Sequence, residues 1–491
     1  MAADCLRWLS DHDRTWRYRS EAWSWIHYSL FVSLFLDHSR AAFDRQHRTC
    51  FNAAPASPCP ARRGGCPSGS HAMRQYQASL PFILITVFID VLGIGLMLPV
   101  LPALVGELAG SPEQQSYWYG ALLVTFGLAQ FLAMPWLGAL SDRYGRRPVL
   151  LLSIFGLGAA YLITATTDSL LILVLSRLLS GATSASFTVA NAYVADITTP
   201  AERSKGFGAI GAAFGLGFIA GPMLGGLLAE SSLRLPFWVA AGMALLNWLY
   251  GWFVLPESLP PERRVPIRLA SSANPFAAMK HLSRLEGAAG LVVVYALVLL
   301  AQWLMHSTWV LYTSFRFDWT PRDNGIALCL FGLTSALAQG LLLGRLLPKL
   351  GENRLLALGL GSSIVASAGY GMAGQPWMLY VLILCNLLAF MVAPLLQGRI
   401  SRAAPESLQG LTQGALNAIA SLSTVIAPLI GTTVLAWVAH LPADDWRLGS
   451  TFFISGLLQL AALALVWHCL RAPAVPPAAT GAASSGRTHP D

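Results

Sequence analysis

Two charged side chains lie inside long apolar segments and could carry proton chemistry. Asp90 lies in the apolar run 79–104, and Arg177 lies in the run 169–193. At about 1.5 Å per residue, Asp90 would lie roughly 15 Å deep in a bilayer. An ionised carboxylate is costly there, so this carboxyl group is suited to exchange a proton. We expect Asp90 and Arg177 to couple proton movement; the alternative is an ion pair that only fixes helix packing.

A short loop between two apolar runs could act as a gate. It reads GALSDRYGRRP from Gly138 to Pro148, with one acid among three arginines. Its glycines allow helix ends to approach closely, and its acid can accept from free N–H groups at a helix N-terminus. The loop could therefore latch one group of helices to another, and the alternative is a basic anchor that only orients the chain. The gate residues we expect are Gly138, Asp142, Arg143, Gly145 and Arg146.

The apolar run 205–229 is unusually rich in glycine and contains one proline. Small residues spaced four apart let helices approach closely, and a proline inside a helix removes a backbone donor and bends the helix. We expect a bend that seals or flexes a pathway. It would be built from Gly217, Gly221, Pro222 and Gly225.

Polar uncharged side chains interrupt the other apolar runs. Such groups need hydrogen-bond partners in hydrocarbon, so helix–helix bonding explains part of them. Those that face a cleft would bind a substrate. The candidates are Gln130, Asn191, Gln302, His306, Gln339 and Gln397.

The composition shows what kind of chain carries these residues. Of 491 residues, 55% are hydrophobic and 11% are charged, and the mean hydropathy is +0.55. Soluble proteins have about twice that charged share, so we expect an integral membrane protein. The net charge of +8 comes from cations between apolar runs rather than from a continuous basic face, which argues against nucleic-acid binding.

The sequence gives little support for an enzyme. The seven cysteines have no zinc-finger or CxxC spacing, which argues against a metal site. We find no phosphate-binding loop and no cluster of nucleophile, base and metal ligands. We therefore expect no catalytic residue, no metal and no cofactor, with a proton as the coupling ion.

Twelve apolar runs are long enough to cross a membrane, and such spans must be helices because lipid satisfies no backbone groups. Loops after even-numbered runs carry roughly fifteen Lys and Arg, and the others about four, which places both termini in the cytoplasm. The runs are approximately 79–104, 117–140, 148–167, 169–193, 205–229, 235–255, 288–314, 324–347, 353–373, 376–398, 410–439 and 448–470.

The two halves of the chain repeat. Gly138 and Gly344, Gly145 and Gly351, and Pro222 and Pro428 share one offset, since 344 − 138 = 351 − 145 = 428 − 222 = 206. A repeated bundle of six helices is typical of secondary transporters, in which the substrate path runs between the halves.

This pattern divides the chain into five parts. We expect a poorly ordered extension over 1–72, with Met73 as the natural start, and a disordered cytoplasmic tail over 471–491. Between them lie six-helix bundles over 73–255 and 287–470, joined by a cytoplasmic loop over 256–286.

Several of these motifs resemble a known family. The loop GALSDRYGRRP and the Gly221-Pro222 step resemble signatures of the major facilitator superfamily. Four further motifs resemble its tetracycline-efflux branch: DxxGIGLxxPVLP from Asp90, YVADIT from Tyr193, LPES from Leu255 and QGxxQG from Gln409. The resemblance implies a major facilitator fold of twelve helices, proton-driven export, a gate at Asp142, Arg143 and Arg146, and pathway residues at Asp90, Gln130, Arg177 and Gln339.

Three positions depart from that branch. Tetracycline exporters carry an acid beside the tyrosine of the third span, where this chain has Ala160 before Tyr161. They carry a histidine in the eighth span and an acid in the ninth, where this chain has Ser335 and Ser363. Fewer ionisable groups change what a pathway can bind, so the resemblance leaves the substrate open.

The sequence therefore predicts a proton-coupled exporter of a small amphipathic or drug-like compound. It would work as a monomer by alternating access in a bacterial inner membrane, where protonation of Asp90 loosens its interaction with Arg177. An uptake symporter of the same fold is the first alternative, and a membrane sensor that transports nothing is the second.

Overall fold

The computed structural model describes residues 70–199, 202–264, 289–404 and 409–471. The chain separates into a unit Met1–His71, almost all of which lies outside the described residues, and a unit Ala72–Asp491. Most of the predicted extension, of the predicted central loop and of the predicted tail lies outside them. The bounds of the five predicted parts stay predictions.

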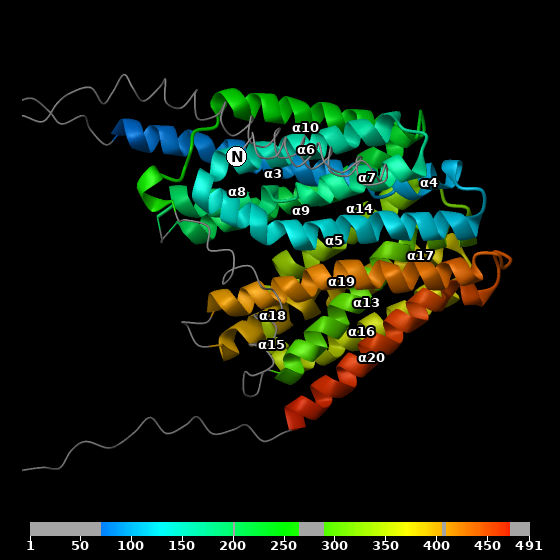
Figure 1. Ribbon diagram of the computed structural model, residues 1–491. Helices are drawn as coiled ribbons and strands as arrows, with labels where there is room; N and C mark the ends of the chain where they lie inside the picture. Colours follow the sequence, from blue (N-terminus) through cyan, green and yellow to red (C-terminus); the bar gives the residue numbers. More distant parts are fainter. Residues whose placement is uncertain (1–69, 200–201, 265–288, 405–408, 472–491) are drawn as a thin grey trace, which may run out of the picture. The chain divides into compact units, whose positions relative to one another are not determined.

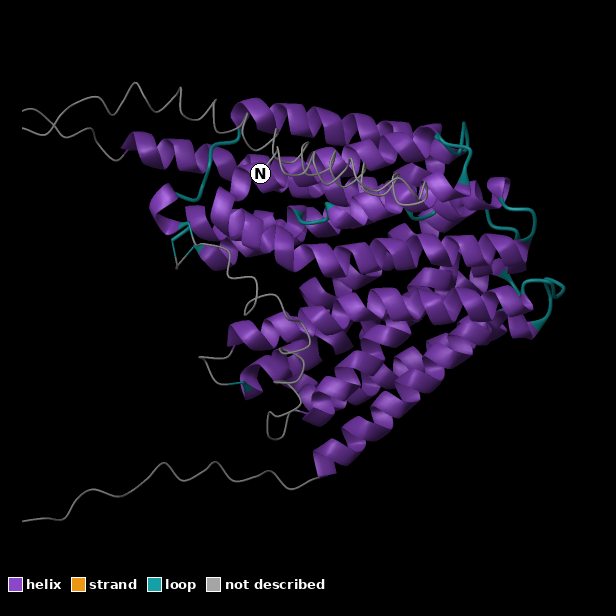
Figure 2. Ribbon diagram, viewed as in Figure 1, coloured by secondary structure: helices purple, strands orange, loops and turns teal. Residues whose placement is uncertain are grey.

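The described residues form helices and connecting turns, with no strand among them (Figures 1 and 2). Twelve helical segments are long and apolar enough to cross a membrane, which confirms the predicted all-α membrane fold. The α-helices are α3 Ser70–Met97, α4 Leu101–Leu108, α5 Pro112–Tyr144, α6 Arg146–Thr166, α7 Leu170–Ala182, α8 Ser186–Ile197, α9 Arg203–Ala229, α10 Leu235–Val254, α13 Ala289–Phe317, α14 Pro321–Leu337, α15 Leu343–Leu350, α16 Glu352–Met372, α17 Pro376–Cys385, α18 Val392–Ala403, α19 Gln409–Val438 and α20 Ser450–Arg471.

Three of the twelve spans are interrupted near their middle. The fourth changes from α7 to α8 through Thr183–Ala185, and the tenth changes from α17 to α18 through a 3-10 turn, η3 Asn386–Met391. The eighth contains a π-helical turn, η2 Ala338–Leu342, between α14 and α15. Spans four and ten occupy corresponding places in the two halves, and such paired interruptions often mark the binding site of a transporter.

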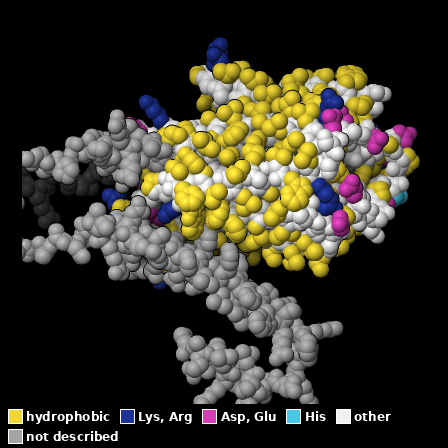
Figure 3. Space-filling view, turned by 90° about the horizontal axis from the view of Figure 1, so that it is seen from above, with side chains coloured by type: hydrophobic (Ala, Val, Ile, Leu, Met, Phe, Trp, Pro, Cys, Tyr) yellow, Lys and Arg dark blue, Asp and Glu magenta, His cyan; other side chains and the backbone are white. Residues whose placement is uncertain are grey.

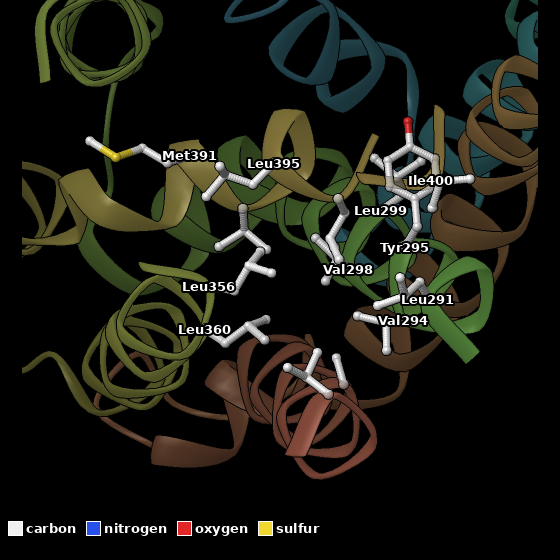
Figure 4. Close-up of a cluster of buried hydrophobic side chains, with 14 of the residues drawn as sticks. Leu291, Val294, Tyr295, Val298, Leu299, Leu356, Leu360, Met391, Leu395 and Ile400 are labelled. Atoms are coloured by element: carbon white, nitrogen blue, oxygen red, sulfur yellow. The ribbon is translucent and has the colours of Figure 1, made fainter. Parts of the chain in front are cut away.

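Each half has its own apolar core. In the first half, residues such as Ile83, Leu150 and Val194 pack together from α3, α6 and α8. In the second half, α13 contributes Val294 and Val298 to a cluster that it shares with α16, α18, α19 and α20 (Figure 4). Burial of such side chains stabilises helix packing by van der Waals contact.

The surface fits a membrane environment. On the face shown in Figure 3, hydrophobic side chains cover the middle and the described charged side chains lie mainly towards the two ends.

The two glycines at one repeat position share a backbone conformation, since φ is +109° at Gly145 and +76° at Gly351. Glycine adopts such angles without strain, and both residues end one span and start the next.

Candidate functional site

Asp90 is buried in α3 without a hydrogen-bond partner. Its side chain is only 6% exposed, and neither carboxylate oxygen bonds to any residue that the structure describes. The side chain of Ser186, the first residue of α8, lies next to it. A buried charge without a partner is costly, so this carboxyl group is placed where gaining or losing a proton has a large energetic effect.

Arg177 lies in α7 and is 3% exposed. One terminal nitrogen donates to the Thr164 hydroxyl at 3.2 Å, and the other contacts the Met97 sulfur. The Tyr161 side chain lies close enough to interact electrostatically with both Arg177 and Asp90. The structure therefore brings Arg177 and Asp90 into one cluster, but the guanidinium binds Thr164 and Met97 instead of pairing with the acid.

The interruption of the fourth span lies beside this cluster. Thr183 donates its hydroxyl proton to the Leu179 carbonyl at 2.9 Å, a local bond that competes with helix continuation. The next residue, Ser184, accepts from the Gln130 side chain of α5 at 2.8 Å. One predicted substrate residue is thus fixed to the same interruption that faces Asp90.

The other predicted substrate residue of the first half bonds within its own helix. Asn191 donates from its side chain to the Phe187 carbonyl of α8 at 2.8 Å. Its amide oxygen therefore keeps its capacity to accept a hydrogen bond. Ser184 and Ser186 are not among the residues predicted from the sequence, although the run GATSAS from Gly181 has the small and hydroxyl residues typical of a helix interruption.

The second half places its candidates in separate surroundings. Gln339 lies in the π-helical turn and donates to the Ser335 hydroxyl at 2.8 Å. Such turns are frequent at functional sites. His306 of α13 lies between the rings of Trp303 and Phe331.

Two candidates of the second half are half-buried amides. Gln302 lies one turn before His306 in α13. Gln397 of α18 donates to the side-chain oxygen of Gln413 in α19 at 3.1 Å. Gln397 thus joins two helices of its own half, which is the packing role that amides commonly have in membranes.

The glycine-rich part of α9 is a packing surface against α3. A Cβ atom added to Gly221 would lie 2.6 Å from Gly95 Cα, and one added to Gly217 would lie 2.9 Å from the Phe88 carbonyl oxygen. Gly225 is pressed against the Leu96 carbonyl, and Pro222 lies inside the helix. Any side chain at these glycines would push the two helices apart.

The two halves of the molecule meet at one end of the spans. Gly226 of α9 packs on Pro321 at the start of α14, and Arg322 pairs with Glu230 at 2.8 Å. Gly120 of α5 packs on Thr432 of α19, and Gly127 packs on Thr424 near the middle of the same two helices. We name this region the sealed end; it lies opposite the loop that contains Asp142.

At the end that contains the Asp142 loop, the same helices part. Gly138 of α5 and Gly414 of α19 have no atom within 4 Å of the position that a Cβ would take. Nearer the middle of the spans, Gly215 of α9 and Gly340 in η2 also have no atom within 4 Å of the position that a Cβ would take. Among the described residues, the glycine contacts between the halves therefore lie towards the sealed end, and Gly138 and Gly414 at the loop end have none.

The predicted gate is a network within the first half. Arg146 donates to Asp142 at 2.5 Å and to Asp196 of α8 at 3.0 Å. Asp196 also accepts from the Ser258 hydroxyl at 3.2 Å. Arg143 is not part of this network; its guanidinium stacks over the Tyr144 ring, 5.2 Å from the ring centre.

Glu257 holds the start of α6. Its carboxylate accepts from the backbone N–H groups of Arg146 at 2.8 Å and Arg147 at 3.3 Å, and from those of Ser258 and Leu259 at 3.0 Å each. Burial raises the pKa of Glu257, although these backbone donors act in the opposite direction. A carboxylate at a helix N-terminus satisfies free donors and interacts favourably with the helix dipole.

We expect Glu257→Ala to destabilise the protein by about 2 kcal/mol, because several charge-assisted hydrogen bonds are lost at once. The measurement is the midpoint of thermal unfolding in detergent, compared with Glu262→Ala. Glu262 is an exposed acid in the following turn, η1 Pro261–Arg263, and its removal should leave the midpoint unchanged. Equal midpoints for the two variants would show that the carboxylate of Glu257 does not hold α6.

The sequence matches the family model of the Major Facilitator Superfamily over residues 83–428. Among curated proteins, the class C tetracycline resistance protein of Escherichia coli is 37% identical over 386 residues, covering 78% of this chain and 95% of its own. Multidrug resistance protein 2 of Bacillus subtilis is 31% identical, with coverage of 78% and 94%.

Solved structures show the same architecture. The human organic anion transporter MFSD10 (TETRAN) aligns with a TM-score of 0.59 and 28% identity, covering 80% of this chain and 99% of its own. The nucleoside transporter NupG, in its D323A form, aligns with a TM-score of 0.68 at 13% identity, covering 80% and 100%. At that identity, the second alignment bears on the fold alone.

Proposed function

The chain belongs to the major facilitator superfamily, and from this premise we propose that it is a proton-coupled exporter of small amphipathic, drug-like compounds. The observation that carries the proposal is the buried, unpartnered carboxyl group of Asp90 in a membrane span. A group that must change its protonation state in a two-half transporter is a means of using the proton gradient. Relatives named for tetracycline and multidrug resistance support export of drug-like compounds.

The protein would work by alternating access, with the proton as the coupling ion and no other cofactor. The excess of cations on the Asp142 side favours a cytoplasmic location for that side and for both termini, in a bacterial inner membrane. The sealed end then faces outwards, and the described state is open to the cytoplasm. Since each chain supplies both halves, a monomer is sufficient.

The separation of Asp90 from Arg177 is compatible with this cycle. When a proton from outside neutralises Asp90, the carboxyl group would no longer hold the guanidinium of Arg177. The guanidinium would then turn to the Thr164 hydroxyl, to which it donates in this structure. Proton release to the cytoplasm would then accompany substrate capture. Each proton supplies about 2.3 kcal/mol per 100 mV of membrane potential and about 1.4 kcal/mol per pH unit.

The substrate pathway of this chain has fewer ionisable side chains than that of the tetracycline-efflux branch. The positions Ala160, Ser335 and Ser363, where the tetracycline-efflux branch carries ionisable groups, are uncharged here. Ala160 and Ser363 are buried, and the Ser335 hydroxyl accepts a hydrogen bond from the Gln339 side chain. We therefore propose that recognition depends on amides such as Gln130 and Gln339 and on aromatic contacts, and that tetracyclines are one class to test among several.

A transport assay tests this proposal. Inside-out membrane vesicles, acidified within by an imposed gradient, should accumulate a tetracycline or another amphipathic drug identified by a resistance panel in a host without its own exporters. Collapse of the gradient should release the compound. Export of the compound from the same vesicles on acidification would indicate an uptake symporter, and no gradient-dependent movement of any panel compound would contradict a transporter of this class.

A further inference from the structure

The interruption of the fourth span is placed to act on Asp90. Helix α8 has twelve residues, and no side chain caps its N-terminus at Ala185. Its start packs against α3, because Ala185 and Val189 share a buried cluster with Val91, and the side chain of its first residue, Ser186, lies near the Asp90 carboxyl group. That carboxyl group is more than nine-tenths buried and has no hydrogen-bond partner among the described side chains and backbone. An uncapped helix start and an unpartnered acid therefore face each other inside the membrane.

These two features complement each other chemically. The N-terminus of a helix carries free N–H donors and partial positive charge, which favour a negative group nearby. The Ser186 hydroxyl can donate to an ionised carboxylate and can accept from a protonated one. The bond to the ionised form is the stronger of the two, because it is charge-assisted.

Neighbouring spans hold the interruption in place. Gln130 of α5 donates to Ser184 at 2.8 Å. Gly181 packs against the Phe126 carbonyl, where an added Cβ would come within 2.5 Å. Thr183 is pressed against Gly156 of α6. A movement of α5 or α6 would thus be passed to the start of α8.

Few other charged or titratable side chains of the described residues lie near Asp90. The groups that face Asp90 are Tyr161 of α6 and Arg177 of α7, both of which interact electrostatically within the cluster. The acid of α8, Asp196, and the bases of α9, Arg203 and Lys205, lie at the loop ends of their helices. Helix α10 carries no charged residue. The uncharged hydroxyl of Ser186 therefore has a local effect that distant charges do not override.

We propose that the interruption Thr183–Ala185 is a positioning element for the proton carrier, and that the Ser186 hydroxyl at the start of α8 sets the pH at which Asp90 exchanges its proton. The inference rests on the proposed role of Asp90 in proton coupling. In this arrangement Ser184 and Gln130 fix the interruption, and Ser186 is the positioning residue that contacts the acid. Conformational change in the first half would alter proton binding by moving α8 relative to α3.

The test is a pH titration of the full-length protein in liposomes by infrared difference spectroscopy. The band of the protonated Asp90 carboxyl group is identified by its loss in Asp90→Asn. We expect Ser186→Ala to move the titration midpoint upwards by about 1 pH unit, because alanine cannot donate the charge-assisted hydrogen bond that the Ser186 hydroxyl would give to the ionised form. The pH profile of drug accumulation in inside-out vesicles should shift in the same direction.

Matched variants separate this role from a structural one. Ser186→Thr retains the hydroxyl and should keep the wild-type midpoint, and Ser186→Cys, a weak donor of similar size, repeats the test if the alanine variant does not insert. Ser180→Ala removes a hydroxyl of α7 that donates to its own helix at Arg177, and it should leave the midpoint unchanged.

A midpoint that stays within 0.2 pH unit (about 0.3 kcal/mol) of wild type in both Ser186→Ala and Ser186→Cys would overturn the inference. A shift in Ser180→Ala as large as that in Ser186→Ala would overturn it as well. The spectroscopic titration needs no transport, so it distinguishes this failure from a failure of proton-driven export, which would leave the titration intact and abolish only the response to the gradient.

Discussion

Asp90→Asn is expected to lower gradient-driven drug accumulation in inside-out vesicles at least tenfold, a cost of about 1.4 kcal/mol or more. Asparagine has nearly the same shape as aspartate but cannot gain or lose a proton. The site is buried and no described residue bonds to either carboxylate oxygen, so the substitution removes the charge without breaking a hydrogen bond. The variant should insert and fold normally for that reason.

The same variant should still exchange substrate across the membrane. Exchange of labelled for unlabelled drug needs the two halves to rock but needs no net proton movement, so we expect a rate within about threefold of wild type. Thr86→Val is the matched control: Thr86 lies one turn before Asp90 in α3 and donates to Asn247 at 3.3 Å. It should retain gradient-driven accumulation. Full accumulation by Asp90→Asn would show that another group carries the proton.

Hydropathy and spacing predicted the parts of the fold that depend on local sequence. The apolar run around Asp90 correctly indicated a buried acid in the first span, since an apolar segment of spanning length must form a helix in lipid. The offset of 206 paired Gly145 with Gly351, and both have positive φ between consecutive spans. Such features follow from the chain's own periodicity and charge, without knowledge of its neighbours.

Features that depend on contacts between distant residues were not predictable in this way. The fourth span reads as one apolar run, and hydropathy does not divide it at Thr183–Ala185, where the small and hydroxyl residues of GATSAS are the only local signal. The bond from Gln130 to Ser184 and the cap of α6 by Glu257 join residues 54 and 111 positions apart. The sequence also suggested an interaction between Asp90 and Arg177. In the structure the Arg177 guanidinium contacts Thr164 and Met97 instead, because helices α3, α6 and α7 converge there.

Asp142→Ala is expected to lower transport about tenfold while leaving the amount of protein in the membrane unchanged. In the described state, the Asp142 side chain is 53% exposed, and among the residues that the structure describes its carboxylate accepts only from Arg146. Helices α5 and α19 touch at Gly127 and part at Gly138, so closure of the loop end would bring the last turn of α5 towards the first turn of α19. The free backbone N–H groups in the first turn of α19 could then donate to the Asp142 carboxylate.

The size of the effect follows from that contact. A hydrogen bond to a charged group contributes about 1.5–3 kcal/mol, which corresponds to a tenfold or larger shift between open and closed states. The repeat supplies the control, because Pro348 in α15 stands where the second half would carry the acid. Pro348→Ala should change transport less than twofold. Since only the first half has a carboxylate at this position, that half alone would control closure of the loop end. Equal effects of the two substitutions on transport would contradict this role and would indicate that the loop only orients the chain in the membrane.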